Sequence, residues 1–182
     1  MLKLNIGSGG ATIPGFQNID RKLGIEAFPL SQYPTGCVEE IRASHILEHF
    51  SFADVEKALA EWVRVLKPGG RIRIAVPDLH KASQLEGQEK AFVLMGGQLD
   101  ADDFHRSAFD EPLLRRYMTK FGIGNIRPWE SDGLDTSSHS CSLNLEGVKL
   151  EKNIQETVKI QAVMSIPRVG WNDHWGCIHD AL

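Results

Sequence analysis

The chain is poor in cysteine, with three in 182 residues, and it has no run of lysine or arginine and no long hydrophobic segment. An odd number of widely spaced cysteines argues against a framework of disulfide bonds. Binding to nucleic acid needs clustered cations, and the formal net charge is −4, so we expect no nucleic acid partner. No segment is apolar over the roughly 20 residues that a membrane span needs, and the amino terminus lacks the pattern of an export signal. These absences predict a cytoplasmic protein without a membrane span.

The composition that remains is that of one well-buried α/β domain. Hydrophobic residues make up 42% of the chain and charged residues 24%, which is typical of a single core. We predict a domain over residues 1–165 and a separate tail over residues 166–182.

The segment Lys3–Asp20, KLNIGSGGATIPGFQNID, carries the clearest functional pattern. A short apolar strand runs into Gly7-Ser8-Gly9-Gly10, and a second short strand ends at Asp20. Glycine permits a sharp turn with positive φ and a close approach of backbone N–H groups to a ligand, while an acid at the next strand's end can bind two vicinal ribose hydroxyls. The pattern predicts a nucleoside cofactor site. Taken alone, the glycines also fit a plain turn, and Asp20 also fits a solvated strand-end acid.

Hydrophobic periodicity predicts two amphipathic helices and a series of strands. One helix follows Ser51-Phe52-Ala53-Asp54, which resembles a capping box, and stops at Pro68-Gly69-Gly70; the other starts at Asp110-Glu111-Pro112 and ends before Gly122. Their buried positions are predicted to be Val55, Leu59, Trp62, Val63 and Leu66 in the first, and Leu113, Leu114, Tyr117, Met118 and Phe121 in the second. The predicted strands are Leu2–Ile6, Phe16–Ile19, Val38–Ala43, Arg71–Val76, Asn125–Trp129, Ser142–Leu150 and Thr157–Ser165.

The connection between the first two strands is too short for a helix. Only about ten residues separate Gly9 from Asp20, whereas a crossover with a helix usually takes a dozen or more. The chain also begins directly at the first strand. Both features would leave one face of the sheet open, and a second copy of the chain could cover it, so we predict a homodimer.

Together with Ala43–Phe50 (ASHILEHF) and Glu61–Leu79 (EWVRVLKPGGRIRIAVPDL), this organisation resembles the class I S-adenosylmethionine-dependent methyltransferases, particularly the small type 11-like branch, over residues 2–130. The resemblance implies a trimmed Rossmann-like α/β fold, with a mostly parallel sheet and an antiparallel C-terminal strand pair at its edge. It implies S-adenosylmethionine as the cofactor and a small-molecule or saccharide-like acceptor. The tail over residues 166–182 is similar to the opening of a second domain in longer, glycosyltransferase-like chains.

The resemblance also implies the residues that bind the cofactor. The glycine loop would pack beneath the methionine part and Asp20 would hold the ribose, while Phe28 stands near the place where many relatives carry an acid beside adenine. The residues predicted to bind the cofactor are Asn5, Gly7, Ser8, Gly9, Asp20, Phe28, Ser44 and His45.

Three histidines are the candidates for catalysis. Methyl transfer is an in-line displacement at a sulfonium carbon, so positioning dominates, but an oxygen nucleophile gains from proton removal by a nearby base. His45 and His49 follow the predicted strand Val38–Ala43, and His105 lies in a loop that resembles the family's substrate-side loop. The alternatives are that His49 is a structural group packing the following helix and that the loop at His105 is an ordinary polar loop.

Other functions fit the residues less well. A zinc site is one alternative, with ligands from His139, Cys141, His174, Cys177 and His179. Because the sequence has no paired Cys-x-x-Cys motif, we predict no metal. A nicotinamide-dependent oxidoreductase would need the third glycine of the dinucleotide fingerprint. A noncatalytic methyltransferase-like module that docks a glycan-assembly partner stays open as the alternative to an enzyme.

Overall fold

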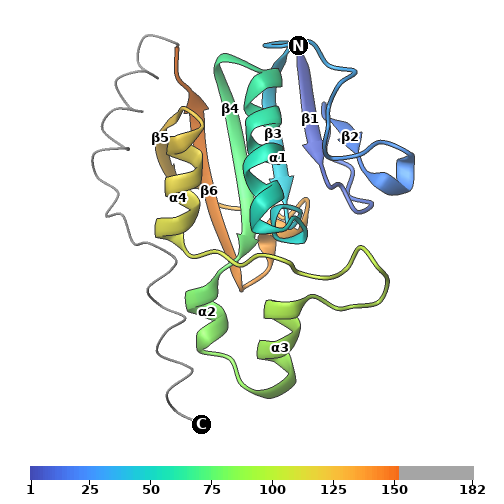
Figure 1. Ribbon diagram of the computed structural model, residues 1–182, viewed down its shortest axis with the longest axis vertical. Helices are drawn as coiled ribbons and strands as arrows, with labels where there is room; N and C mark the ends of the chain where they lie inside the picture. The colour runs from blue at the N-terminus through green and yellow to red at the C-terminus, as the bar shows by residue number, and fades with distance from the viewer. Residues whose placement is uncertain (152–182) are drawn as a thin grey trace.

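Six strands form a single sheet in the computed structural model, which describes residues 1–151 (Figure 1). The strands lie in the order β2-β1-β3-β4-β6-β5. β2, β1, β3 and β4 pair in parallel, whereas β6 runs antiparallel to both of its neighbours. The strand bounds are Leu2–Ile6 (β1), Gln17–Ile19 (β2), Val38–Ser44 (β3), Leu66–Pro77 (β4), Ile123–Pro128 (β5) and Ser142–Lys149 (β6).

The predicted fold class is confirmed, but the prediction of how the antiparallel strand pairs was wrong. β6 does not lie at the edge of the sheet: it lies between β4 and β5 and pairs with both. The predicted strand at 157–165 and the tail at 166–182 lie outside the described residues. The domain boundary at residue 165 therefore stays a prediction.

Two helices, α1 (Phe52–Val65) and α4 (Glu111–Lys120), cover one face of the sheet (Figure 1). Six of the ten predicted positions are buried in these helices, because 3.6 residues per turn brings them onto one face: Val55, Leu59, Trp62 and Val63 in α1, and Leu114 and Met118 in α4. Of the other four, Leu66 is buried but belongs to β4, and Leu113, Tyr117 and Phe121 are only partly buried against the core. Trp62 at the centre of α1 is fully buried, and its Nε1–H donates to the carbonyl of Ala27 at 2.8 Å. This bond fastens the irregular segment between β2 and β3 to α1.

The ends of α1 differ in detail from the prediction. The Ser51 hydroxyl donates to the Asp54 carboxylate at 2.8 Å instead of accepting from a helix N–H group. The helix ends at Val65 and β4 begins at once with Leu66, so Pro68-Gly69-Gly70 lies within the irregular start of that strand. Gly70 is required there, because a Cβ atom at this position would lie 2.8 Å from the Lys67 carbonyl oxygen.

The opposite face of the sheet carries charged side chains. Lys3 pairs with Glu40 (2.9 Å), Arg73 lies between Glu40 (3.4 Å) and Glu146 (3.0 Å), and Arg127 also pairs with Glu146 (2.8 Å). The connections at 7–16 and 20–37 contain no α-helix, only the short 3-10 helix η1 (Arg21–Leu23), so within residues 1–151 no helix lies over this row of charges. The prediction of a missing crossover helix is confirmed.

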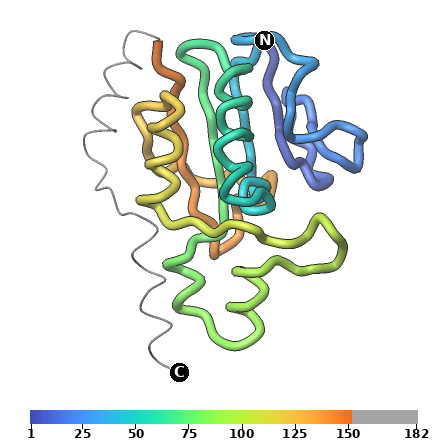
Figure 2. Tube along the Cα trace, in the orientation of Figure 1, coloured from blue at the N-terminus to red at the C-terminus, as the bar shows by residue number. Residues whose placement is uncertain are grey.

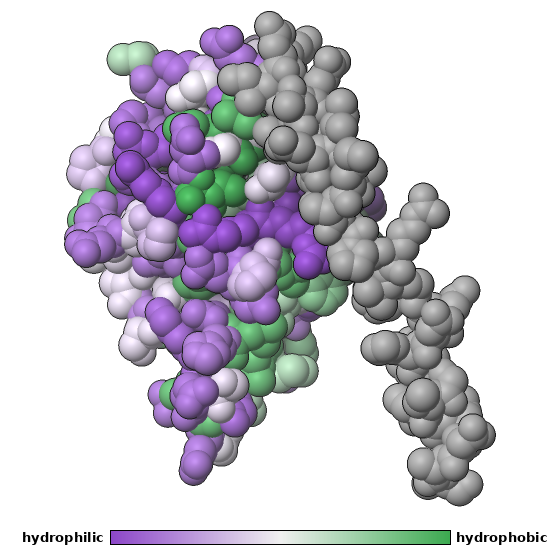
Figure 3. Space-filling model, turned by 90° about the vertical axis from the view of Figure 1, so that its left-hand side faces the viewer, coloured by the Kyte–Doolittle hydropathy of each residue, from purple (hydrophilic) through white to green (hydrophobic). Residues whose placement is uncertain are grey.

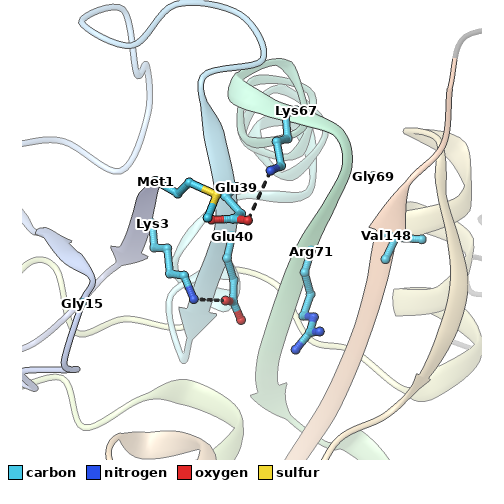
Figure 4. A pocket seen from close by; sticks show the side chains of 9 residues that line it. All are labelled: Met1, Lys3, Gly15, Glu39, Glu40, Lys67, Gly69, Arg71 and Val148. Carbon is cyan, nitrogen blue, oxygen red and sulfur yellow. Dashed lines mark hydrogen bonds and ion pairs between the residues drawn. The ribbon is translucent and has the colours of Figure 1, made fainter.

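A shallow pocket of about 680 Å³ lies on this charged face (Figure 4). The ion pairs Lys3–Glu40 and Lys67–Glu39 cross it, and Arg71 projects from β4 beside them. It is lined near the amino ends of β1 and β3, whereas ligands of open α/β sheets bind at the carboxyl ends.

On the side of the molecule formed by β5 and α4, hydrophobic residues show in limited areas between hydrophilic ones (Figure 3).

The carboxyl end of the sheet is crossed by the chain between β4 and α4, which includes two short helices, α2 (Leu79–Ser83) and α3 (Gly87–Met95) (Figure 2). Backbone bonds dock this insertion: Leu79 N–H donates to the Phe109 carbonyl at 2.8 Å, and Arg106 N–H donates to the Glu48 carbonyl at 2.7 Å. None of the described helices is long and apolar enough to cross a membrane.

Candidate functional site

The glycines of the loop after β1 differ in how closely other atoms pack against them. Gly7 has φ +69°, and a Cβ atom at this position would lie 2.5 Å from the Cβ of Ile46. Gly9 (φ +60°) and Gly10 (φ +123°) have no atom within 4 Å of such a Cβ. Gly7 is therefore required by packing inside the protein, while Gly9 and Gly10 leave open space on the outer side of the loop.

Asp20 is joined to this loop at the end of β2. One carboxylate oxygen accepts a hydrogen bond from Gly9 N–H at 2.7 Å, and the other accepts from Lys22 N–H at 2.9 Å and caps η1. The Asp20 carboxylate thus links the glycine loop to the start of η1 at the end of β2. Since a carboxylate oxygen has more than one lone pair, both oxygens keep capacity for hydroxyl donors.

Asn5 supports the loop from beneath. Its side chain is 2% exposed and donates to the Asn18 side chain at 3.1 Å, and Asn18 in turn donates to the Ala11 carbonyl at 3.0 Å. The structure therefore gives Asn5 a part in holding the loop in place.

A pocket of about 300 Å³ opens beside the loop. Ser8, Gly9 and Ala11 form one wall, and the opposite wall comes from the connection between β5 and β6, at 133–136 and His139. The sequence reasoning had not assigned this second wall. No local pattern in the sequence marks this wall, because Arg42 holds it in place through contacts with residues about 90 positions away.

Arg42 fixes that connection to the sheet. It is 1% exposed and donates two hydrogen bonds to Asp132, both at 2.8 Å, and one to Asp135 at 2.6 Å. The Arg42 guanidinium lowers the pKa of Asp132 from 3.8 to about 2. Burial raises the pKa of Asp135, but the hydrogen bonds from Arg42 and Ser137 outweigh it, so the net shift is downward. Both carboxylates are held in the charged form opposite the glycine loop.

Phe28 and Ser44 have different positions relative to this pocket. Phe28 is partly buried against the hydrophobic core and is not a lining residue of the pocket. Ser44 ends β3 and is 5% exposed, and its carbonyl accepts a hydrogen bond at 3.3 Å from Thr136, which does line the pocket.

His45 is held at both ring nitrogens. Its backbone has φ +52°, which is uncommon outside glycine, and its N–H donates to the Ala75 carbonyl at 2.8 Å. Nδ1 lies 3.2 Å from a carboxylate oxygen of Glu48, and Nε2 lies 2.6 Å from the Ser142 hydroxyl. The imidazole is thus fixed in orientation at the carboxyl end of β3.

His49 and His105 lie together on the other side of Glu48. Their rings meet edge to face with centroids 5.0 Å apart, although 56 residues separate them in the chain. Burial lowers the pKa of His105, which favours the neutral imidazole, and its Nδ1 lies 3.0 Å from the Val93 carbonyl. The structure therefore groups all three predicted catalytic histidines around the fully buried Glu48.

Comparisons with known proteins bear on the kind of domain and on its fold. A family model described as a methyltransferase domain, of the type 11 group that the sequence resembles, matches residues 21–74. This match covers 54 of the 182 residues and supports a likeness to the class I S-adenosylmethionine-dependent methyltransferases. No curated protein gives a significant sequence match to it.

Solved structures of methyltransferases share the fold of this chain at low sequence identity. An S-adenosylmethionine-dependent methyltransferase from Archaeoglobus fulgidus is 11% identical with a TM-score of 0.57, over 81% of this chain and 85% of that one. The 1,6-didemethyltoxoflavin-N1-methyltransferase from Burkholderia thailandensis, solved with S-adenosylhomocysteine, is 17% identical with a TM-score of 0.51, over 82% and 71%. The CurJ carbon methyltransferase is 10% identical with a TM-score of 0.52, over 83% of this chain, which spans only 49% of the CurJ chain.

This likeness implies S-adenosylmethionine as the cofactor, and the loop region has the properties that such a ligand requires. Gly9 and Gly10 leave the outer side of the loop free, the adjoining pocket has room for part of a nucleoside ligand, and Asp20 offers an acceptor for hydroxyl groups. Asp20 itself is not a lining residue of the pocket, but it is bonded to Gly9, which is. The residues present therefore fit the cofactor.

Proposed function

We propose that this protein is an S-adenosylmethionine-dependent methyltransferase that methylates a hydroxyl group of a small, saccharide-like acceptor, with His45 as the base that takes the hydroxyl proton. The observation that supports it best is the anchoring of His45 at both ring nitrogens, by Glu48 and by Ser142, at the carboxyl end of the sheet. S-adenosylmethionine supplies an electrophilic methyl group when bound.

The contacts of His45 suggest how its reactive nitrogen becomes available. The charged contact with the Glu48 carboxylate favours a proton on Nδ1, which leaves Nε2 as the nitrogen that accepts a proton. Ser142 Oγ lies near Nε2, but it also lies within 3.2 Å of the Thr136 carbonyl. The Ser142 hydroxyl can turn to Thr136 when an acceptor hydroxyl takes its place at Nε2. Glu48 then stabilises the positive charge that develops on the ring.

The chemistry of the surroundings supports the proposed acceptor class. CurJ is a carbon methyltransferase and the Burkholderia thailandensis enzyme is an N1-methyltransferase, so the shared fold does not select the nucleophile. The site here gathers His45, His139 and Ser142, which are hydrogen-bonding groups suited to a polar acceptor. The insertion at 78–110 lies across this end of the sheet and favours a small acceptor over a polymer.

A noncatalytic docking module for a glycan-assembly partner is the second candidate. The missing crossover helix favours it, because less structure surrounds the cofactor loop than a helix would provide. A homodimer, a cytoplasmic location and the absence of a nucleic acid partner stay predictions. The charged, internally paired sheet face would make any dimer interface there polar.

His45→Ala separates these functions. We expect its turnover to fall by about 100-fold or more, the usual loss for a general base, while its affinity for S-adenosylmethionine changes little. Transfer of labelled methyl from S-adenosylmethionine to a panel of sugars and sugar nucleotides measures turnover, and calorimetry measures affinity. His80→Ala is the matched control, since His80 is exposed on α2. Equal losses in turnover and affinity would remove His45 from the chemistry, and cofactor binding without turnover on any acceptor would favour the docking module.

A further inference from the structure

We infer that Glu48, His49 and His105 form a binding site for a divalent transition-metal ion of the zinc type. Such a site goes beyond methyl transfer. It also differs from the zinc site considered in the sequence analysis, which shares none of these three residues. Part of that earlier set, His174, Cys177 and His179, lies outside the described residues.

The three side chains already converge. One potential ligand atom from each lies within 4.8 Å of the other two. Ligand atoms about 2.0–2.1 Å from a tetrahedral ion lie roughly 3.3 Å from one another, so small rotations of these side chains would close the site.

The backbone holds the two parts of the site together before any ion binds. Glu48 and His49 belong to the 3-10 helix η2 (Leu47–His49), and His105 lies in the insertion. The Glu48 carbonyl accepts hydrogen bonds from Arg106 N–H at 2.7 Å and Ser107 N–H at 3.1 Å. His105 N–H donates to the Met95 carbonyl at 3.0 Å. These bonds on either side of His105 fix its position opposite His49.

The ring of His105 is oriented as a metal ligand is. Its Nδ1 lies 3.0 Å from the Val93 carbonyl, which leaves Nε2 as the coordinating atom. A ligating histidine usually donates its other ring N–H to a carbonyl or carboxylate, because this bond sets the tautomer and the ring plane.

Buried atoms without partners point to a missing ligand. Both carboxylate oxygens of Glu48 and the Nδ1 atom of His49 are shielded from solvent and have no hydrogen bond from the described residues. Glu48 has one charged contact, between Oε1 and His45 Nδ1 at 3.2 Å, and this leaves Oε2 available. A fully buried carboxylate in this state is costly, and an unsatisfied buried group of this kind is often explained by an ion. A cation between Glu48, His49 and His105 would satisfy these atoms together.

The donor set indicates which ions would bind. Two imidazoles and one carboxylate suit Zn²⁺, Co²⁺ or a similar ion, whereas Mg²⁺ and Ca²⁺ prefer oxygen ligands. Three protein ligands leave an open coordination position for water or another oxygen ligand.

Metal binding by the whole purified chain tests the site. After treatment with a chelator, the protein is incubated with Zn²⁺, Co²⁺ or Mg²⁺, passed over a gel-filtration column, and analysed for bound metal by mass spectrometry. We expect one equivalent of Zn²⁺ or Co²⁺, with a visible Co²⁺ spectrum, and no retained Mg²⁺. His49→Gln and His105→Gln should each weaken metal binding by at least ~10-fold. Loss of a residue that only orients a metal ligand already has an effect of this size, and these variants would remove a ligand itself. His80→Gln should bind like the unmodified chain.

Two results would overturn the inference. One is no retained Zn²⁺ or Co²⁺. The other is equal binding by all variants, which would place the ion elsewhere. Thermal melting of the metal-free variants verifies that they are folded. If either His49→Gln or His105→Gln fails to fold, the other variant still tests the site. The affinity for S-adenosylmethionine is measured on the same samples. Because metal binding and cofactor binding are separate measurements, a failure of the metal site is distinguished from a failure of the proposed function.

Discussion

Gly7 and Gly9 stand two residues apart in the same loop, yet they serve different purposes. Both have positive φ, but only Gly7 packs against Ile46. The sequence predicted that both contact the cofactor, because the pattern of glycines shows the bend and not the direction in which each α-carbon faces. The structure gives Gly7 a packing role and leaves the outer side of the loop to Gly9 and Gly10.

Alanine substitution separates the two glycines. Each variant has the cost of placing a Cβ at positive φ, about 1 kcal/mol. Gly7→Ala should lose about 1–3 kcal/mol more than Gly9→Ala in free energy of unfolding, because its Cβ would lie 2.5 Å from Ile46. Urea denaturation of both variants measures the difference. Equal losses would show that the loop moves away from Ile46 without cost.

Asp132 should make stability depend on pH in the acid range. Its pKa is about 2 in the folded chain against an ordinary 3.8, so its stabilising contribution is present above about pH 4 and disappears as the pH falls toward 2. The carboxylate is half exposed, and solvent screening limits this contribution to about 1 kcal/mol.

Asp132→Asn tests this dependence. Between about pH 5 and about pH 2 the unmodified chain should lose about 1 kcal/mol more free energy of unfolding than Asp132→Asn, because the amide does not titrate. Urea denaturation at the two pH values gives both quantities. Parallel losses in the two proteins would show that the Arg42–Asp132 pair contributes no acid-dependent stability.

At the level of elements, helices with strong local signals were predictable and weakly patterned ones were not. α1 and α4 have apolar stripes at helical spacing, and α4 has the cap at Asp110 that the sequence indicated. α3 has no buried residue and exposes Phe92 and Met95, so it has no stripe to detect. The place of β6 between β4 and β5 was also missed, because strand order depends on contacts distant in the sequence.

The cap of α4 gives a direct test at this level. The Asp110 carboxylate accepts a hydrogen bond from Leu113 N–H at 2.8 Å at the first turn. Asp110→Ala should lower the free energy of unfolding by about 1 kcal/mol, since the N–H group loses its partner. Urea denaturation measures the loss, and Asp110→Asn, which keeps an acceptor oxygen, should retain most of the stability. An unchanged stability of Asp110→Ala would mean that water replaces the cap.

Across the whole molecule, the sheet is covered by helices on one face and by its own ion pairs on the other. The alternation in LKLNI and RIRIAV places Leu4, Ile72 and Ile74 toward the helices, and Lys3, Arg71 and Arg73 on the charged face. Parallel strands buried on both faces would be apolar throughout. The same alternation that predicted the strands therefore also indicated a sheet with one polar face.

The candidate site was predictable in part for the same reason. The glycine loop and Asp20 are close in sequence, so their proximity follows from a local pattern. The wall at 133–139 depends on Arg42 pairing with Asp132 and Asp135, about 90 residues away. The meeting of His49 with His105 depends on the docked insertion. Neither long-range contact leaves a motif in the sequence.

Calorimetric titration of the chain with S-adenosylmethionine tests the central claim, that the glycine loop and Asp20 form the cofactor site. We expect saturable binding at one site, and Asp20→Ala should weaken it by about 10- to 150-fold, because hydrogen bonds to a charged group contribute about 1.5–3 kcal/mol. Asp110→Ala is the matched control, since it also removes a capping aspartate, and its affinity should be unchanged. An absence of saturable binding, or an Asp20→Ala affinity equal to that of the unmodified chain, would contradict the account.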